Sequence, residues 1–303
     1  MAMTKTSVGI IPLLCWAVAS QIQLKAATAG SPQLVQAIVG FNAPNTLGLP
    51  CTSCLGFPAG TVWIQPDHFV SAGSSGLYYA VFQENGWSGN LNSNFQLSGG
   101  GGVLQDVILN GTLTNGQGLL VLSASETIPD TTYSGPATLT VTTTATPNDG
   151  SPPFILASMV DMMVGTTNIR GVVQVFAGLN ASNDDLFPCT DCGPPGTIGI
   201  QPDQFPQPGT SAVEYVLFES AGWYGTVNST MDLIEKSGVV QSLPLGALID
   251  SRDTVLTLIS ADFSPAGNGY IGPAALRVSS TATSRHGSGE HFTYKSFSPL
   301  TIQ

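Results

Sequence analysis

The chain has 303 residues, of which 19 are Asp or Glu and 8 are Lys or Arg; its formal net charge is −11 and 9% of its residues are charged. An ordinary soluble domain carries about a quarter charged residues, so Ser, Thr, Asn and Gly must supply most of this surface. The excess of acid argues against nucleic acids and anionic membranes, because both are bound through Lys and Arg. With 42% hydrophobic residues the chain can bury a core, which excludes the composition of a disordered protein.

Residues 1–29 have the order of a secretory signal. Lys5 precedes the apolar run Val8–Ala19, and small residues follow that run. The run is shorter than the roughly 20 residues that span a bilayer. We therefore expect a signal peptide and N-terminal arm, with cleavage after Ala19 or Ala29. The mature protein is then secreted or held at the cell surface, with no membrane span.

The rest of the chain contains the same unit twice. Matching segments recur in the same order at a nearly constant offset, which indicates a duplication. We predict two homologous domains over 33–164 and 171–303. The matching pairs are GFNAPN (40–45) with GLNASN (178–183), IQPDHF (64–69) with IQPDQF (200–205), YAVFQENGWSG (79–89) with YVLFESAGWYG (215–225), and YSGPATLTVTTTATP (133–147) with YIGPAALRVSSTATS (270–284).

Within each copy the apolar residues recur with a period of two, as in β-strands. Clusters of Gly, Pro, Asn and Asp separate these runs, and a parallel sheet would need crossover helices that the pattern lacks. We predict an all-β fold of two tandem antiparallel β-sandwiches, immunoglobulin-like or jelly-roll-like. The strands expected in the first copy are Val35–Phe41, Thr61–Gln65, Leu77–Gln83, Val103–Leu109, Leu119–Ser125, Ala137–Thr144 and Phe154–Met159.

Each copy carries one Cys-x-x-Cys pair, Cys51 with Cys54 and Cys189 with Cys192. In an exported chain such pairs are disulfides by default. Prolines precede both pairs, so no helix N-terminus is present to lower a thiol pKa for redox catalysis. A four-cysteine zinc site or a disulfide between the domains are the alternatives.

The densest group of oxygen ligands is Asn180, Asn183, Asp184, Asp185 and Asp191, which could coordinate calcium in an extracellular loop. The matching loop of the first copy has no carboxylate, so such a calcium site would belong to the second domain alone. We expect no other cofactor.

Asp67 and Asp203 occupy the repeated Ile-Gln-Pro-Asp. A carboxylate there could be a catalytic acid or a calcium ligand, but an Asp that caps a turn after a strand is the more common role.

Two tryptophans, Trp87 and Trp223, recur in Gly-Trp-x-Gly, and Tyr224 follows the second. Exposed aromatic rings near turns can stack on sugars, which makes these three residues candidates for glycan binding. The alternative is a Trp at a strand end that closes the core of each sandwich.

No catalytic constellation emerges from the sequence. Three histidines and unpaired carboxylates do not build a serine triad or a glycosidase pair. The segment 26–169 contains no Lys or Arg, so its Thr-rich strands lack the Lys residues that usually protect sheet edges. The arm Gln21–Pro32 could add a strand to a neighbour.

The sequence therefore predicts a secreted, non-enzymatic structural or adhesive protein at the cell surface, with self-association as one mode of action. A carbohydrate-binding module that uses exposed Trp or Tyr side chains on a surface glycan is the alternative function.

Overall fold

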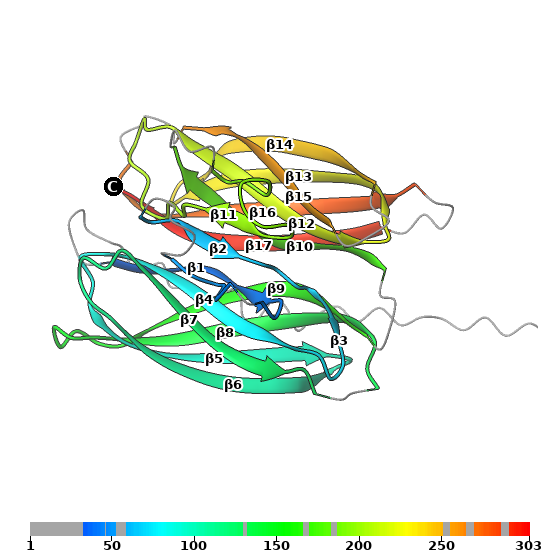
Figure 1. Ribbon diagram of the computed structural model, residues 1–303. Helices are drawn as coiled ribbons and strands as arrows, with labels where there is room; N and C mark the ends of the chain where they lie inside the picture. Colours follow the sequence, from blue (N-terminus) through cyan, green and yellow to red (C-terminus); the bar gives the residue numbers. More distant parts are fainter. Residues whose placement is uncertain are drawn as a thin grey trace, which may run out of the picture.

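The computed structural model describes residues 33–45, 47–52, 59–129, 132–165, 170–182, 187–250, 255–264, 270–285 and 291–303. Every regular element within these ranges is a β-strand, so the predicted all-β fold class is confirmed (Figure 1). The first half of the chain forms β1 (Gln33–Asn42), β2 (Val62–Ile64), β3 (Phe69–Ser71), β4 (Ser75–Asn85), β5 (Gly89–Gly99), β6 (Gly102–Leu113), β7 (Leu119–Thr127), β8 (Gly135–Pro147) and β9 (Phe154–Gly165). The second half forms β10 (Gly171–Ala181), β11 (Ile198–Ile200), β12 (Ala212–Ala221), β13 (Tyr224–Glu235), β14 (Gly238–Asp250), β15 (Val255–Phe263), β16 (Gly272–Ser284) and β17 (His291–Ile302).

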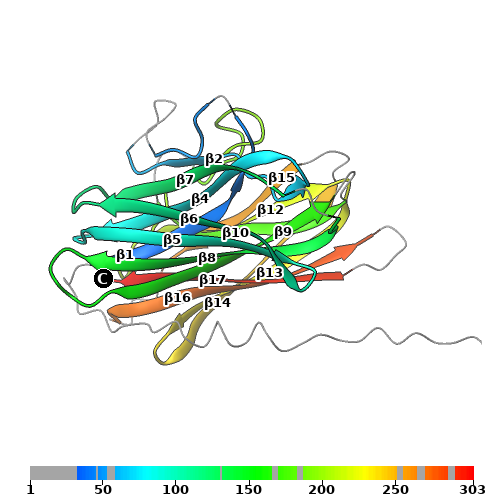
Figure 2. The ribbon, with the colours of Figure 1, turned by 90° about the horizontal axis from the view of Figure 1, so that it is seen from below.

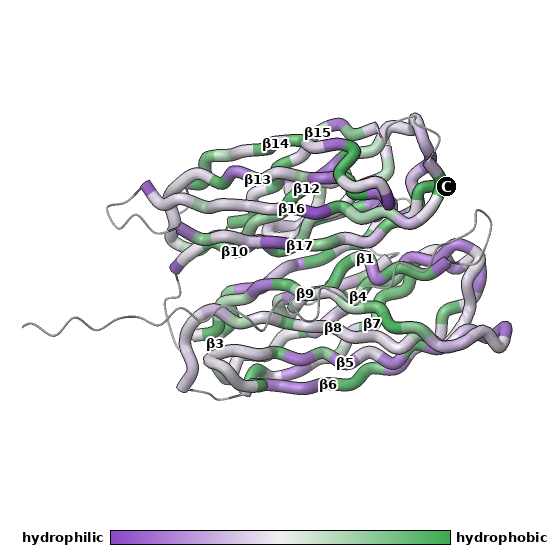
Figure 3. Tube along the Cα trace, turned by 180° about the vertical axis from the view of Figure 1, so that it is seen from behind, coloured by the Kyte–Doolittle hydropathy of each residue, from purple (hydrophilic) through white to green (hydrophobic). Residues whose placement is uncertain are grey.

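The first sandwich packs a three-stranded sheet, β1-β4-β7, against a five-stranded sheet, β3-β9-β8-β5-β6 (Figure 2). All pairings are antiparallel except that between β3 and β9. Phe82 and Tyr78 from the small sheet meet Phe95 and Leu139 from the large sheet in one buried core. Along β5, buried residues alternate with more exposed ones, and Figure 3 shows hydrophobic and hydrophilic positions interleaved along the strands.

The second sandwich repeats this arrangement, with β10-β12-β15 facing β14-β13-β16-β17. Its core contains Phe218 and Val216 on one side and Met231 and Leu276 on the other. β1 and β10 even carry a register shift at the same place, between Gln36 and Ile38 and between Gln174 and Phe176. The duplication read from the sequence is therefore also a duplication of backbone detail.

A buried polar network lies inside each sandwich. In the first, the Thr143 hydroxyl donates to Gln36 Oε1 at 2.9 Å and lies 2.8 Å from the Ser93 hydroxyl. Hydrogen bonding of buried polar groups stabilises a specific core, because each unpaired group costs about 1–3 kcal/mol. The second sandwich has the same network on Gln174, Ser280 and Ser229, with a 2.6 Å bond from the Ser280 hydroxyl to Gln174 Oε1.

The two sandwiches are in direct contact (Figure 1). β4 is buried on both faces: Phe82 points into its own sandwich, whereas Tyr79 and Val81 point toward the other one. Tyr215 and Leu217 of β12 meet them in a third hydrophobic cluster, which also includes residues of β2 and β11. We call β2, β11 and the outward faces of the two three-stranded sheets the interdomain interface.

The structure also contains strands that the alternating pattern did not predict. β5 reads GNLNSNFQLSG, and its Asn, Ser and Gly residues are uncommon in strands. It is nevertheless an interior strand, paired with β8 on one side and β6 on the other, and Phe95 and Leu97 on its inner face are fully buried. Among the described residues, no helix is long and apolar enough to cross a membrane.

Candidate functional site

The interdomain interface is organised around an approximate two-fold axis. β2 pairs antiparallel with β11, and the central pair is Trp63 with Gly199. These two positions are equivalent in the repeats, so the axis passes between them. A Cβ on Gly199 would lie 2.8 Å from Trp63 Cζ2 and 2.5 Å from Phe187 Cε1, so only glycine leaves room for the indole.

Reciprocal hydrogen bonds join the sandwiches on both sides of this axis. The backbone N–H of His68 donates to Glu219 Oε2 at 2.8 Å. At the equivalent place, the backbone N–H of Gln204 donates to Gln83 Oε1 at 2.8 Å, and Gln83 Nε2 donates to the carbonyl of Pro202 at 3.1 Å. Each Ile-Gln-Pro-Asp loop is thus held by a side chain of the opposite sandwich.

Ionisable groups are enclosed in this interface. Glu219 is 1% exposed, and burial raises its pKa to about 8; the nearby Asp67 adds to the rise and the N–H of His68 opposes it. Burial also raises the pKa of Asp67 to about 6, against a hydrogen bond from the Phe69 backbone. The His68 ring is fully buried, neither ring nitrogen has a hydrogen-bond partner among the described residues, and burial lowers its pKa to about 3.

The same sheets enclose Tyr79 and Tyr215, whose pKa values are raised mainly by burial. Burial therefore shifts each of these groups toward its neutral form. The loop residues Asp67 and His68 and the strand residue Glu219 face one another across it, but solvent does not reach His68 or Glu219. The arrangement encloses these groups between the two sandwiches.

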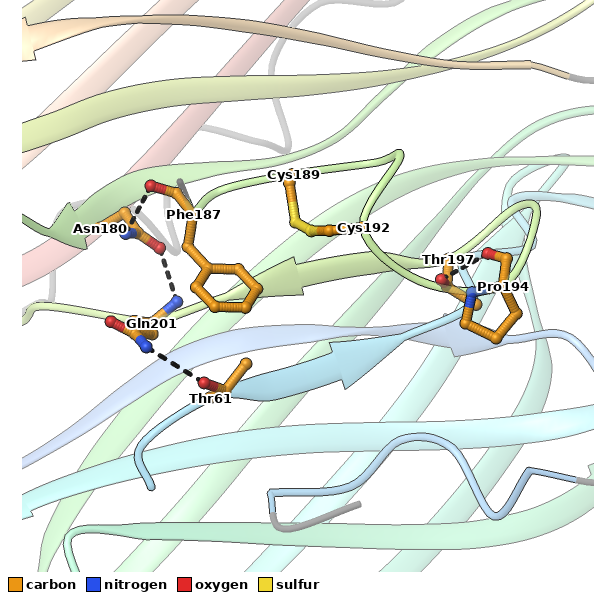
Figure 4. Close-up of a disulfide and its surroundings, with 8 residues drawn as sticks. All are labelled: Thr61, Asn180, Phe187, Cys189, Cys192, Pro194, Thr197 and Gln201. Carbon is orange, nitrogen blue, oxygen red and sulfur yellow. Dashed lines mark hydrogen bonds between the residues drawn. A yellow bond between two sulfur atoms is a disulfide. The ribbon is translucent and has the colours of Figure 1, made fainter. Parts of the chain in front are cut away.

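The loops before β2 and β11 are fixed by equivalent asparagines. Asn180 Oδ1 accepts the backbone N–H of Gln201 at 2.6 Å, and its Nδ2 donates to the carbonyl of Phe187 at 3.1 Å (Figure 4). Asn42 makes the corresponding bonds to the Gln65 N–H and the Leu49 carbonyl. Gln201 also reaches the other sandwich, because its Nε2 donates to the Thr61 hydroxyl at 3.2 Å.

This placement bears on the calcium hypothesis. Asn180 is fully buried and its amide oxygen already accepts a hydrogen bond, which leaves it unsuited as an exposed calcium ligand. Asn183, Asp184 and Asp185 lie outside the described residues. Within the described part of the chain, no group of three or more His, Cys, Asp or Glu side chains could hold a metal ion.

The cysteine loops lie beside the axis. A disulfide joins Cys189 and Cys192, whose Cα atoms are 6.0 Å apart (Figure 4). Cys51 is also disulfide-bonded, and Cys54 lies outside the described residues. Cys51 and Cys189 pack against a small cluster formed by Leu49, Trp63 and Phe187, in which Trp63 and Phe187 make an edge-to-face contact at 6.0 Å. The disulfide loops thus contribute to contact between the sandwiches.

The two repeated tryptophans close the cores. Trp87 and Trp223 are each 4% exposed and belong to the core clusters of their own sandwiches. The second glycine of each Gly-Trp-x-Gly makes room for the indole: a Cβ on Gly89 would lie 2.6 Å from Trp87 Cη2, and one on Gly225 equally close to Trp223 Cη2. These rings are therefore placed as core residues, not as surfaces on which a sugar could stack.

Tyr224 differs from its neighbour, because it is half-buried and the Arg285 guanidinium lies 6.0 Å from its ring centroid.

Asp203 Oδ1 accepts the backbone N–H of Phe205 at 3.3 Å, which is the turn-capping role expected from its sequence position.

Sequence reasoning did not find the reciprocal interface bonds. The sequence does differ between the repeats at the residues that make these bonds: His68 is replaced by Gln204, and Gln83 is replaced by Glu219. Because the repeats were read as separate domains, nothing in the pattern indicated that a residue of one would bind the loop of the other.

No family model matches the chain, and no curated protein matches it. Among solved structures it resembles the transglutaminase of red sea bream (9% identity, 82% of this chain and 32% of that chain, TM-score 0.24). It also resembles a tetra-tandem repeat in the extending region of a large adhesion protein (14% identity, 75% and 45%, TM-score 0.19) and the alpha-2-macroglobulin of E. coli (10%, 80% and 16%, TM-score 0.25). The chain spans less than half the length of each, and likenesses at these scores carry no inference about function.

Proposed function

We propose that the chain is an exported, non-enzymatic structural or adhesive protein whose two sandwiches act as one rigid body. The observation that carries this proposal is the interdomain interface, with its hydrophobic cluster and its reciprocal bonds to Gln83 and Glu219. Buried apolar area contributes about 25 cal/mol per Å², so two domains that share a core are expected to resist separation. A fixed relation between domains suits a protein that bears load or presents a surface.

The placement of the ionisable groups supports a non-enzymatic role. Two of the strongly perturbed ones, His68 and Glu219, are enclosed between the sandwiches. A general acid or base must be within hydrogen-bond reach of its substrate, and these groups are not exposed to one.

A sheet edge with a single charged residue supports self-association. β6 is the outer strand of the five-stranded sheet, and Asp106 is the one charge among its 12 residues. Edge strands without Lys or Pro can pair with another chain. The equivalent edge strand β14 contains Pro244, which cannot donate a ladder hydrogen bond, so we expect β6 to be the edge that associates.

The test is electron microscopy and size-exclusion chromatography of the mature chain, beside the variant Ile108→Lys. Ile108 is 62% exposed on β6, and a lysine there should shift the chain toward monomers. The control is Leu248→Lys, which places a lysine at an exposed position of β14. Monomers at all concentrations together with no adhesion to cells would contradict the proposal, as would substrate turnover mapped to these domains.

A further inference from the structure

The outer face of the first sandwich contains a shallow hollow of about 370 Å³ across strands β6, β5 and β8. Its exposed side chains project from the side of the five-stranded sheet opposite the core, and these strands lie on the side of the first sandwich remote from the second (Figure 1). Its lining consists almost entirely of amide and hydroxyl side chains. The lining residues are Asn90, Leu91, Asn92, Asn110, Gly111, Thr112, Thr144 and Thr146.

The strand register arranges these side chains in two rows. Asn90 lies between Thr112 and Thr146 in the first row, and Asn92 lies between Asn110 and Thr144 in the second. Neighbouring strands are about 4.8 Å apart and alternate residues on a strand about 6.8 Å apart, so the rows form a regular array of hydrogen-bonding groups. All the side chains project from paired strands, which hold a site more precisely than loops do.

Only part of the hydrogen-bonding capacity of this array is used within the protein. The Thr112 hydroxyl donates to Asn90 Oδ1 at 2.9 Å, and Asn92 Nδ2 donates to Asn110 Oδ1 at 2.7 Å. These two bonds orient three amides. Among the described residues, Asn90 Nδ2, Asn92 Oδ1, Asn110 Nδ2 and the Thr144 and Thr146 hydroxyls have no partner.

We propose that this hollow binds a neutral, hydroxyl-rich glycan chain, an inference that rests on the proposed adhesive function. The free groups include amide donors, an amide oxygen and hydroxyls that both donate and accept, and sugar hydroxyls complement all of these. An anionic ligand would find no cation, because the segment 26–169 has no Lys or Arg. A peptide strand could not add here, because the backbone of β5 is already paired on both sides.

The backbone below the hollow is held against the core. A Cβ on Gly111 would lie 2.4 Å from Leu122 Cδ2, so the sheet packs closely at this point. The hollow is therefore preformed, which reduces the entropy lost on binding.

The second sandwich offers a matched comparison. Asn92 and Thr144 of the first sandwich correspond to Asn228 and Thr281 of the second. The partner of Asn228 on β14 is Gly246, and the β14 residue of the neighbouring row is Leu248. Gly246 has no side chain, and Leu248 is 52% exposed where the first sandwich has a threonine. The second face therefore lacks the polar groups of one strand, and we expect it not to bind.

The experiment measures binding of the mature chain to three soluble neutral polysaccharides, a linear β-glucan, a xylan and a mannan, with a sulfated polysaccharide as charge control. The test variant is Thr144→Val with Thr146→Val, which removes both hydroxyls and keeps β-branched side chains on a strand. The matched control is Thr281→Val with Thr283→Val in the second sandwich. We expect at least one neutral polysaccharide to bind, the test variant to bind at least tenfold more weakly, and the control to bind within twofold of the original chain.

The inference is overturned if no neutral polysaccharide binds, if the sulfated one alone binds, or if the control loses binding as much as the test variant. Thermal melting of both variants by circular dichroism shows whether they keep the fold. Microscopy of the same samples separates the two proposals: a chain that assembles without binding any glycan contradicts this inference alone, and a chain that does neither contradicts both.

Discussion

Gln83 and Glu219 occupy equivalent positions in the two repeats, and each accepts a backbone N–H from the opposite sandwich at 2.8 Å. Gln83 also donates from its amide nitrogen to a carbonyl, which an ionised carboxylate at the same place could not do. A protonated Glu219 has the donor and acceptor pattern of the glutamine. The rise of its pKa to about 8 therefore fits its position in the interface.

Replacing Glu219 by glutamine should remove a pH dependence of folding stability. The carboxyl has a pKa of about 8 in the folded protein and an ordinary value of 4.5, so its contribution is fully favourable below about pH 4.5 and is lost as the pH rises to about 8. One pKa unit corresponds to about 1.4 kcal/mol. We expect Glu219→Gln to unfold at the same urea concentration as the original chain at pH 4.5 and to be more stable by a few kcal/mol at pH 9.

The facing groups set the control for this measurement. Asp67, with a pKa of about 6, lowers the free energy of unfolding by a smaller amount as the pH rises from about 4 to 6, and it does so in both proteins. The neutral side chains of His68, Tyr79 and Tyr215 leave the free energy of unfolding unchanged between pH 7 and 9. If the free energy of unfolding changed equally between pH 7 and 9 in the original chain and in Glu219→Gln, Glu219 would not be enclosed as described.

His68→Gln should reduce acid sensitivity. The ring is neutral and buried with a pKa of about 3 against an ordinary 6.5, so the folded state loses stability as the pH falls from about 6.5 toward 3. Glutamine is the residue that the second repeat has at this place, Gln204, so it should fit there. Glu219 and Asp67 gain stability over the same range in both proteins, so urea unfolding should show that the variant becomes more stable relative to the original chain as the pH falls from 7 to 4. An unchanged difference would contradict the burial of His68.

Trp223→Ala should destabilise the fold by about 3–5 kcal/mol, as expected for a large side chain removed from a core. Tyr224→Ala, one residue away and half-buried, is the control and should cost much less. Chemical denaturation of both variants decides between a core and a binding role. If Trp223→Ala were as stable as the original chain, the indole would not be a core residue.

Gly89→Ala should cost about 1–3 kcal/mol, because the new methyl group would lie 2.3 Å from the Thr146 carbonyl oxygen and would force the strand away from Trp87. Gly225→Ala should behave alike, since its Cβ would lie 2.3 Å from the Thr283 carbonyl oxygen. A Cβ on Gly102 meets no atom within 4 Å, so Gly102→Ala is the matched control. The midpoints of thermal unfolding provide the comparison, and three equal midpoints would contradict the close packing.

The sequence was sufficient to predict the fold class and most strands of the first copy, because their inward residues alternate with polar ones. It did not predict β5, whose outward residues are Asn, Gln and Ser; its stability depends on pairing with β6 and β8, which no local pattern encodes. Buried residues on both faces of β4 could have indicated the interface, since the run LYYAVF is apolar beyond the needs of one core.

The candidate residues were harder to predict, because side-chain type does not reveal direction. Trp87 and Asn180 are of types that bind sugars and calcium, yet both are buried in structural roles. The hollow on β5, β6 and β8 has no sequence signature, because it consists of common Asn and Thr residues that the register alone brings together.

The central claim is that the two sandwiches form one rigid body, and residual dipolar couplings of the mature chain test it most directly. Backbone N–H couplings from the core strands of each sandwich, for example β4 and β12, are fitted separately. The account predicts that both sets yield the same alignment tensor in magnitude and orientation. Two tensors of different magnitude would show that the sandwiches move independently and would contradict it.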